Sequence, residues 1–132
     1  MTAATGTAIE KVGTVIVTVG DQEAAIAFYT EKLGFEKRTD VPMGDQYRWV
    51  EVAPPGAETT IAVVPPRPGE EAGGAQTGIA LSSSDVDADH ATMRERGIDV
   101  DEEVSRMGGP VPPMFWFHDL DGNALLVVQS QG

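Results

Sequence analysis

Few residues in this chain can carry chemistry, since its 132 residues include two histidines and no cysteine. Without cysteine, neither disulfides nor thiolate metal sites can form. His118 stands beside Asp119, and such a pair next to a turn is more often a surface hydrogen bond than a ligand set. His90 falls on the apolar stripe of an expected helix, which indicates a core or boundary histidine. His118 and Glu51 are candidate acids or bases, but no partner is obviously placed for proton transfer, so the catalytic residues are unknown.

The charge balance restricts the partners of this protein. Twenty-one acidic residues against nine basic ones give a formal net charge of −12. This balance argues against nucleic acid, which requires Lys and Arg to neutralise its phosphates, and it permits attraction of a cationic small molecule. No apolar run approaches the roughly 20 residues of a membrane span. Residues 1–7 lack the basic and apolar parts of a secretory signal, so we expect a cytoplasmic protein without a membrane partner.

The elements that must position any site are clearest near the carboxyl end. Residues 114–118 and 124–128 are typical of two strands, and Asp121-Gly122-Asn123 between them supplies residues that accept positive φ in a tight turn. The second arm is almost entirely apolar. We therefore expect that strand to be buried on both faces.

The two halves of the chain repeat one another. An offset of 64 residues relates Thr14 to Gly78 on one pair of strands and Thr60 to Ala124 on another. A Pro- and Gly-rich linker at 65–74 separates the halves. The pattern predicts a single α+β domain of two tandem β-α-β-β-β modules, at about 9–64 and 75–129. The expected strands are 14–19, 35–41, 47–53, 59–64, 78–82, 98–104, 114–118 and 124–128; the helices begin after Asp21 and Ser84 and end at Gly34 and Gly97.

Three motifs at matching positions make the chain similar to a known family. They are Ala27-Phe28-Tyr29 with Leu33-Gly34-Phe35, Asp85-Val86-Asp87 with Arg96-Gly97-Ile98, and the run from Phe117 to Asn123. The sequence resembles the vicinal oxygen chelate superfamily, which includes glyoxalase I, bleomycin-resistance proteins, fosfomycin-resistance enzymes and extradiol dioxygenases. The resemblance implies paired modules whose mixed sheets curve round a cavity, and it implies a homodimer.

The same resemblance implies where a metal would sit. In metal-dependent members, His or Gln on the first strand and a carboxylate on the last strand of each module hold a divalent cation. Carried over by position, these sites fall on Thr14, Gly78, Ala62 and Leu126. Divalent ions of this kind need imidazole or carboxylate donors, which these residues lack. We therefore expect neither a metal nor another cofactor.

Strand parity and the family register predict an apolar cavity for an organic ligand. Trp116 matches a position that carries a substrate-contacting aromatic residue in the fosfomycin-resistance members, and an indole can stack on a flat or cationic ligand. Ordinary core packing is the alternative for Trp116 and Met114. The predicted lining is Thr14, Ile16, Trp49, Ala62, Gly78, Ala80, Met114, Trp116, His118 and Leu126.

Three functions follow from these observations. The first is a metal-free protein of the bleomycin-resistance type, which sequesters a small organic molecule and so confers antibiotic resistance. The second is a metal-independent enzyme that uses His118 or Glu51. A metal-dependent lyase or dioxygenase is the least favoured, because its ligands are missing. Residues 106–113 form either a lid over the cavity or a stiff connection.

Overall fold

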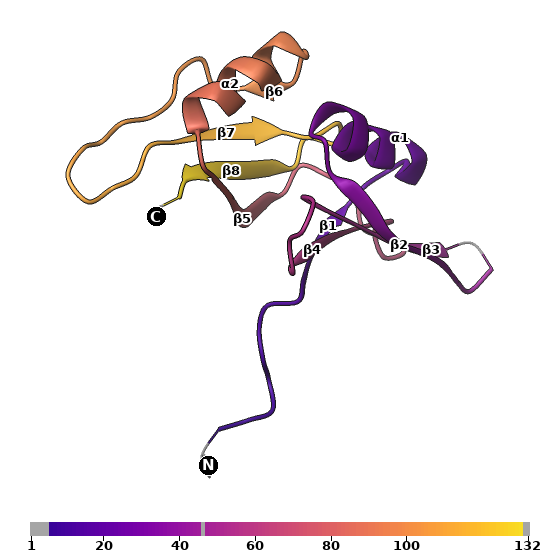
Figure 1. Ribbon diagram of the computed structural model, residues 1–132. Helices are drawn as coiled ribbons and strands as arrows, with labels where there is room; N and C mark the ends of the chain where they lie inside the picture. The colour runs from indigo at the N-terminus through magenta and orange to yellow at the C-terminus, as the bar shows by residue number, and fades with distance from the viewer. Residues whose placement is uncertain (1–5, 46, 131–132) are drawn as a thin grey trace.

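Two four-stranded sheets form the protein, as a computed structural model of residues 6–45 and 47–130 shows (Figure 1). The first sheet has the strand order β1-β4-β3-β2, and the second has the equivalent order β5-β8-β7-β6. The first sheet comprises β1 (Thr14–Thr18), β2 (Glu36–Met43), β3 (Tyr47–Ala53) and β4 (Thr60–Val64). The second comprises β5 (Gln76–Ser83), β6 (Asp99–Val100), β7 (Met114–His118) and β8 (Ala124–Gln129).

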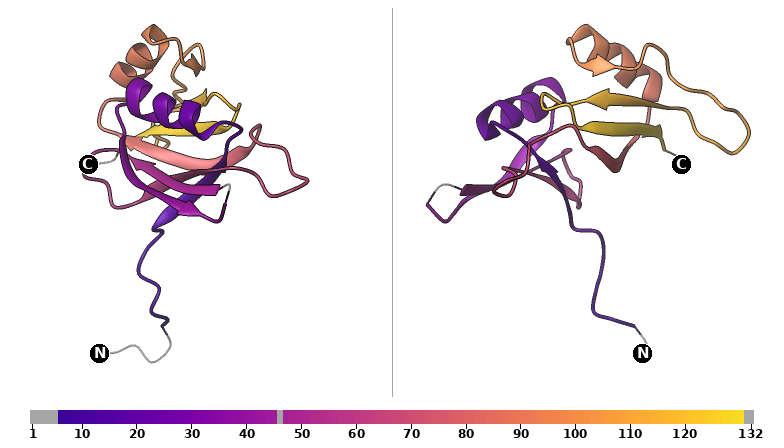
Figure 2. Two further views of the ribbon diagram at one scale, coloured as in Figure 1. Left: turned by 90° about the vertical axis from the view of Figure 1, so that its right-hand side faces the viewer. Right: turned by 180° about the vertical axis from the view of Figure 1, so that it is seen from behind.

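One helical segment follows the first strand of each sheet. Helix α1 (Gln22–Ala27) continues into a π-helical turn, η1 (Phe28–Lys32), and α2 (Val86–Glu95) is its counterpart. Both helices lie on the same side of the molecule, and the described N-terminal residues project away from the body on the other side (Figures 1 and 2). The α+β architecture of two β-α-β-β-β modules is therefore confirmed.

The predicted 64-residue repeat extends to the register of the strands. Ile16 pairs with Ala62 in the first sheet, and Ala80 pairs with Leu126 in the second, so both members of the pair are displaced by 64. Gly78 breaks the equivalence. Its φ is +72°, and the β5–β8 register shifts between Gln76 and Ala80, so β5 carries a bulge where β1 is regular. Glycine suits this position because a side chain there would strain the backbone.

The core lies between the sheets and the helices. Alternate residues of the central strands, such as Val50 and Val52, point toward the helices and are fully buried. Asp21 begins α1 as predicted, because its carboxylate accepts a hydrogen bond from the Ala24 N–H at 3.1 Å. The buried core residues are Val17, Val19, Ala25, Phe28, Tyr29, Val50, Val52, Ile61, Val63, Val86, Met93, Ile98, Phe115, Phe117, Leu125 and Val127.

A buried carboxylate joins the two modules. Asp119, at the end of β7, is 7% exposed and accepts four hydrogen bonds. Its Oδ2 accepts from the Tyr29 hydroxyl and the Asn123 amide, each at 3.0 Å, and its Oδ1 accepts from the backbone N–H groups of Asp121 and Asn123. Asn123 also donates to the carbonyl of Thr18 at 3.0 Å. The turn of the second module is thereby attached to the first strand and helix of the other.

Burial, followed by the negative charge of Asp119, raises the pKa of Tyr29 far above its ordinary value. The tyrosine therefore stays protonated and acts as the donor. A second contact between the modules shows the internal symmetry: Lys32 donates to the carbonyl of Arg96, and Arg96 donates to the carbonyl of Lys32, each at 2.7 Å.

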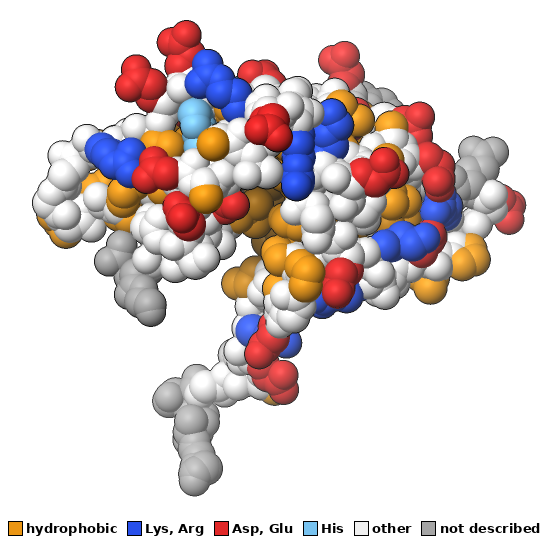
Figure 3. All heavy atoms as spheres, turned by 45° about the horizontal axis from the view of Figure 1, so that its top comes forward, with side chains coloured by type: hydrophobic (Ala, Val, Ile, Leu, Met, Phe, Trp, Pro, Cys, Tyr) orange, Lys and Arg blue, Asp and Glu red, His pale blue; other side chains and the backbone are white. Residues whose placement is uncertain are grey.

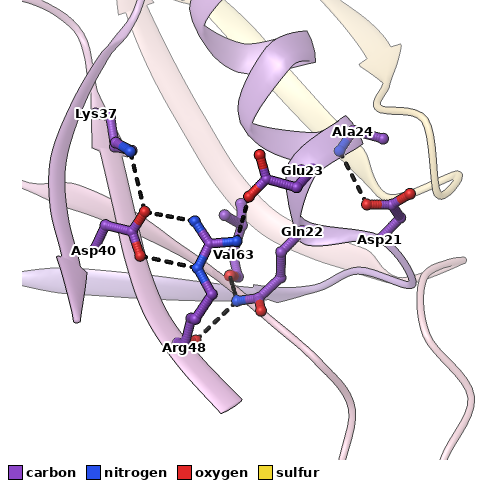
Figure 4. Close-up of polar contacts among 8 residues, drawn as sticks. All are labelled: Asp21, Gln22, Glu23, Ala24, Lys37, Asp40, Arg48 and Val63. Atoms are coloured by element: carbon purple, nitrogen blue, oxygen red, sulfur yellow. Dashed lines mark hydrogen bonds and ion pairs between the residues drawn. The ribbon is translucent and has the colours of Figure 1, made fainter. Parts of the chain in front are cut away.

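A polar cluster on the first module fixes strand β3 against α1 (Figure 4). The Arg48 guanidinium donates to both oxygens of Asp40 and also to Glu23 at the start of α1. Gln22 donates to the carbonyls of Arg48 and Val63, at 2.8 and 3.0 Å. Hydrogen bonds from Arg48 and Lys37 lower the pKa of Asp40 to about 2.

The turn between the last two strands is as predicted, since Gly122 has the positive φ that a tight turn requires. Three other details of the local prediction were wrong. Asp85, not Ser84, caps α2 by accepting from Ala88.

The other two details concern strands. The strand predicted at 98–104 is reduced to Asp99–Val100. The Trp116 backbone N–H donates its hydrogen bond to the Asp101 carboxylate, and the regular pairing with a backbone carbonyl ends there. Strand β8 is buried on one face only, and Leu126 and Val128 are half-exposed on the other.

Replacing Tyr29 by Phe tests the buried contact between the modules. The change leaves Asp119 with one donor fewer in a buried site, so we expect a loss of about 1–3 kcal/mol in the free energy of unfolding. Urea denaturation provides the measurement. Tyr47→Phe is the matched control, because Tyr47 is 37% exposed, and it should change stability little. Equal effects of the two substitutions would contradict the assignment.

Replacing Asp40 by Asn tests the polar cluster through pH. The lowered pKa of Asp40 means that its ionised form stabilises the folded state above the ordinary carboxyl pKa, and this contribution is lost as the pH falls toward about 2. The stability difference between wild type and Asp40→Asn should therefore be largest near neutral pH and shrink on acidification. Denaturation curves across that range measure it, with exposed Asp45→Asn as the control. If the stability difference between wild type and Asp40→Asn did not change with pH, the assigned role of Asp40 would be wrong.

Candidate functional site

Helices cover one face of each sheet; the other face, which no helix of the described part of the chain covers, is called here the open face. The predicted site residues lie on these open faces, because they alternate along the strands with the core residues that point to the helices. Ile16 on the first open face is 57% exposed. Met114, Trp116 and Leu126 on the second are half-buried. Apolar side chains are thus presented to the surroundings on both sheets.

A chain of hydrogen bonds runs across the first open face. The Trp49 indole N–H donates to Glu51 Oε2 at 2.6 Å, and the Thr60 hydroxyl donates to Glu51 Oε1 at 2.7 Å. The Thr14 hydroxyl lies 2.9 Å from that of Thr60. Ala62, which pairs with Glu51 across the sheet, is fully buried. The carboxylate and the indole are therefore held in one arrangement by neighbouring strands.

The second open face combines an indole with acidic groups. Trp116 pairs with Leu126 in the β7–β8 register, and His118 pairs with Ala124. Asp101 accepts a hydrogen bond from the Trp116 backbone N–H at 2.9 Å. The side chain of His118 is 43% exposed, and its Nδ1 lies 3.4 Å from the Asp99 carboxylate. A hollow of about 320 Å³ lies here, lined by Gln76, Asp101, Trp116, His118 and Ala124.

A groove of about 770 Å³ separates the first strands of the two modules. Ile16 of β1 lines one side, and Gly78 and Ala80 of β5 line the other. Each of these strands is at the edge of its sheet, so its outer backbone groups have no strand partner within residues 6–45 and 47–130. Hydrophobic side chains are visible in the hollow between the two modules, whereas acidic side chains are spread over both (Figure 3).

The ten predicted lining residues are divided between the two sheets. Trp49 lines a third hollow of about 250 Å³, beside Tyr47, Val64 and the prolines that follow β4. Trp49 and Trp116 therefore stand on different open faces. Thr14, Ile16, Trp49 and Ala62 belong to the first sheet, and Gly78, Ala80, Met114, Trp116, His118 and Leu126 belong to the second.

The residues at the family's metal positions do not fit a divalent cation. Thr14 offers a hydroxyl that is already hydrogen-bonded to Thr60, and Gly78 lies in the bulge without a side chain. Ala62 and Leu126 present only hydrocarbon. Within residues 6–45 and 47–130, no three His, Asp or Glu side chains come together as a potential metal site.

The other histidine and the proposed lid lie outside these faces. His90 is half-buried on α2, with its ring 5.0 Å from that of Phe115 and its Nε2 2.6 Å from the Asp101 carbonyl oxygen. The segment at 106–113 projects beyond the ends of β7 and β8 (Figure 1), and Arg106 pairs with Asp87 at 2.5 Å. Whether this segment closes over a ligand stays a prediction.

Several polar residues of the open faces were missed as binding residues. Glu51 was considered only as an acid or base, although its parity with Trp49 on β3 places both on one face. Thr60 and Asp101 were not considered. Thr60 could have been found from the 64-residue repeat, because it corresponds to Ala124. Asp101 gave no signal, since it lies in an acidic run that is usually a solvated surface.

These features define the class of protein: two repeated modules, each with a helix on one side of a sheet and an open face on the other. Residues 11–127 match the model of the Glyoxalase/Bleomycin resistance protein/Dioxygenase superfamily. The chain belongs to this superfamily, so the resemblance inferred from its motifs is confirmed. Among the described residues, no helix is long and apolar enough to cross a membrane.

Similar proteins come from several bacteria. Protein YetH of Bacillus subtilis (strain 168) is 34% identical over 119 residues, which cover 90% of this chain and 98% of YetH. The crystal structure of TnmS3, an antibiotic binding protein from Streptomyces sp. CB03234, has a TM-score of 0.82 and 37% identity, covering 96% of this chain and all of TnmS3. A superfamily member from Sphaerobacter thermophilus DSM 20745 has a TM-score of 0.84 and 36% identity, covering 92% and 98% of the two chains.

Proposed function

We propose that this protein binds and sequesters a small organic molecule without a metal. The observation that carries the proposal is the chemistry of the open faces, which present two indoles and aliphatic side chains, whereas the positions where metal-dependent relatives place ligands carry no imidazole or carboxylate. Such surfaces hold organic ligands by contact and by a few polar groups. The similarity to TnmS3, an antibiotic binding protein, supports an antibiotic as the ligand and resistance as the role.

We further propose that two copies of the chain complete the binding cavity. In a single chain, Ile16 is 57% exposed, and Leu126 and Val128 are only partly buried. Large apolar side chains gathered on a sheet face are typical of a surface that another protein covers. A homodimer in which the first open face of one copy meets the second open face of the other would bury these residues and bring one Trp49 near the partner's second sheet.

A metal-independent enzyme is the alternative function. The pairing of His118 with Asp99 favours it, because a carboxylate can orient an imidazole for proton transfer. The His118→Ala protein should then lose turnover of any substrate that is found, and unchanged turnover would exclude this role for His118.

Titration calorimetry against cationic glycopeptides and planar aromatic compounds tests the binding function. We expect a ligand with micromolar or tighter affinity, whose binding persists in EDTA because no metal takes part. Trp116→Ala should weaken binding about tenfold or more through lost stacking. Leu120→Ala is the control, because Leu120 is 63% exposed on the β7–β8 turn. Dependence on a metal, or no binder across the panel, would count against the proposal.

Light scattering on the purified protein tests the dimer. Wild type should have twice the mass of the chain, and Ile16→Glu should give the monomer, because it places a charge on the face that the second copy covers. Circular dichroism would confirm that the variant is folded. Leu120→Glu should stay dimeric, because Leu120 is about as exposed as Ile16 but lies on the β7–β8 turn and not on an open face. A monomeric wild type at micromolar concentration would show that the cavity is not shared.

A further inference from the structure

Glu51 is held on the first open face without using all its capacity to accept hydrogen bonds. The side chain is half-buried, and each oxygen accepts one hydrogen bond from a neutral donor: Trp49 at 2.6 Å and Thr60 at 2.7 Å. A carboxylate oxygen has about two lone-pair positions. Each oxygen therefore retains an unused position, while the carboxylate as a whole is already oriented by its neighbours.

Glu51 also has no positive partner. Among the described residues, no Lys, Arg or His nitrogen lies within 4.0 Å of its oxygens. Arg48 is close in sequence, but it points to the opposite face of β3, where Asp40 and Glu23 take its donors (Figure 4). Asp40, a half-buried carboxylate of the same sheet, has two cationic partners. A partly buried charge without compensation is costly unless a partner supplies the opposite charge.

The indole beside Glu51 adds a second element of recognition. Its N–H is bonded to Glu51, which fixes the orientation of the ring. Trp49 also lines the apolar hollow of about 250 Å³ with Tyr47 and Val64. A cation over an indole face is attracted by its quadrupole, and a charged N–H donor forms its strongest hydrogen bonds with a carboxylate. An aromatic ring and a carboxylate on one face therefore suit an organic cation with a flat body.

We propose that Glu51 and Trp49 form the subsite that recognises a positively charged amine on the ligand. This inference rests on the proposed binding function and names the chemical class of the ligand. The amine donates to the unused positions of Glu51, and the flat body lies against Trp49 and Tyr47. Arg48 and Arg67 line the hollow and Glu51 does not, so the two guanidinium groups disfavour a cation inside the hollow and the charged end of the ligand lies outside it, at Glu51.

A pair of probes that differ in charge tests the subsite. The probes are 9-aminoacridine, which is protonated at mildly alkaline pH, and acridine, which is neutral there and has nearly the same shape. Calorimetry on the intact protein should find the cation bound more tightly. Glu51→Gln keeps a carbonyl oxygen that can accept from Trp49 and presents an amide N–H whose hydrogen bond the Thr60 hydroxyl can accept, but it removes the charge. It should therefore weaken 9-aminoacridine about tenfold and leave acridine within about twofold.

Glu31→Gln is the matched control, because it removes the same charge from an exposed position on η1 and should change neither affinity. An equal loss in the two variants would mean that only net charge matters, and it would overturn the subsite. If both probes bind the wild type equally and Glu51→Gln changes neither, the binding function stands and the subsite is wrong. If neither probe binds at millimolar concentration, the subsite and the binding of flat aromatic molecules both fail.

Discussion

The buried Asp119 carboxylate is the interaction on which the arrangement of this protein depends. It lies in the turn between the last two strands and accepts four hydrogen bonds, one of them from Tyr29 in the other module. Because a buried carboxylate must have its acceptors satisfied, the turn and the first module can meet in few ways. The family motif around His118 and Asp119 is thus explained by packing: Asp119 and Asn123 join the modules, and His118 lies outside that network on the second open face.

The modules meet through their helices and turns, so the open faces of both sheets point away from this contact. Ile16 on the first open face is exposed, Leu126 on the second is partly buried, and each open face carries one indole. The family scaffold uses these faces to hold a metal, but here the corresponding residues cannot coordinate one. The remaining polar groups, Glu51 and Asp101, orient or flank the indoles.

The repeat made much of this predictable. The offset of 64 residues predicted equivalent strands in the two modules, and the structure extends it to the strand register, where Ile16 pairs with Ala62 and the equivalent Ala80 pairs with Leu126. It failed where one module departs from the other. The bulge at Gly78 shifts the pairing, and Asp101 ends β6 early by accepting the Trp116 N–H. Neither the bulge nor the shortened strand can be recognised from the periodicity of the sequence, since each depends on a single side chain or backbone angle.

The sequence by itself determined the fold and the family, because these depend on local patterns and on residue identity at counted positions. Only the tertiary structure decided which polar groups meet. Glu51 accepts a hydrogen bond from Thr60 on the neighbouring strand. Asp119 accepts one from Tyr29, which lies 90 residues earlier in the chain. The incomplete burial of Leu126 was also a tertiary outcome. Its apolar neighbours predicted burial on both faces, but burial depends on what packs against a strand, and the described residues supply helices for one face alone.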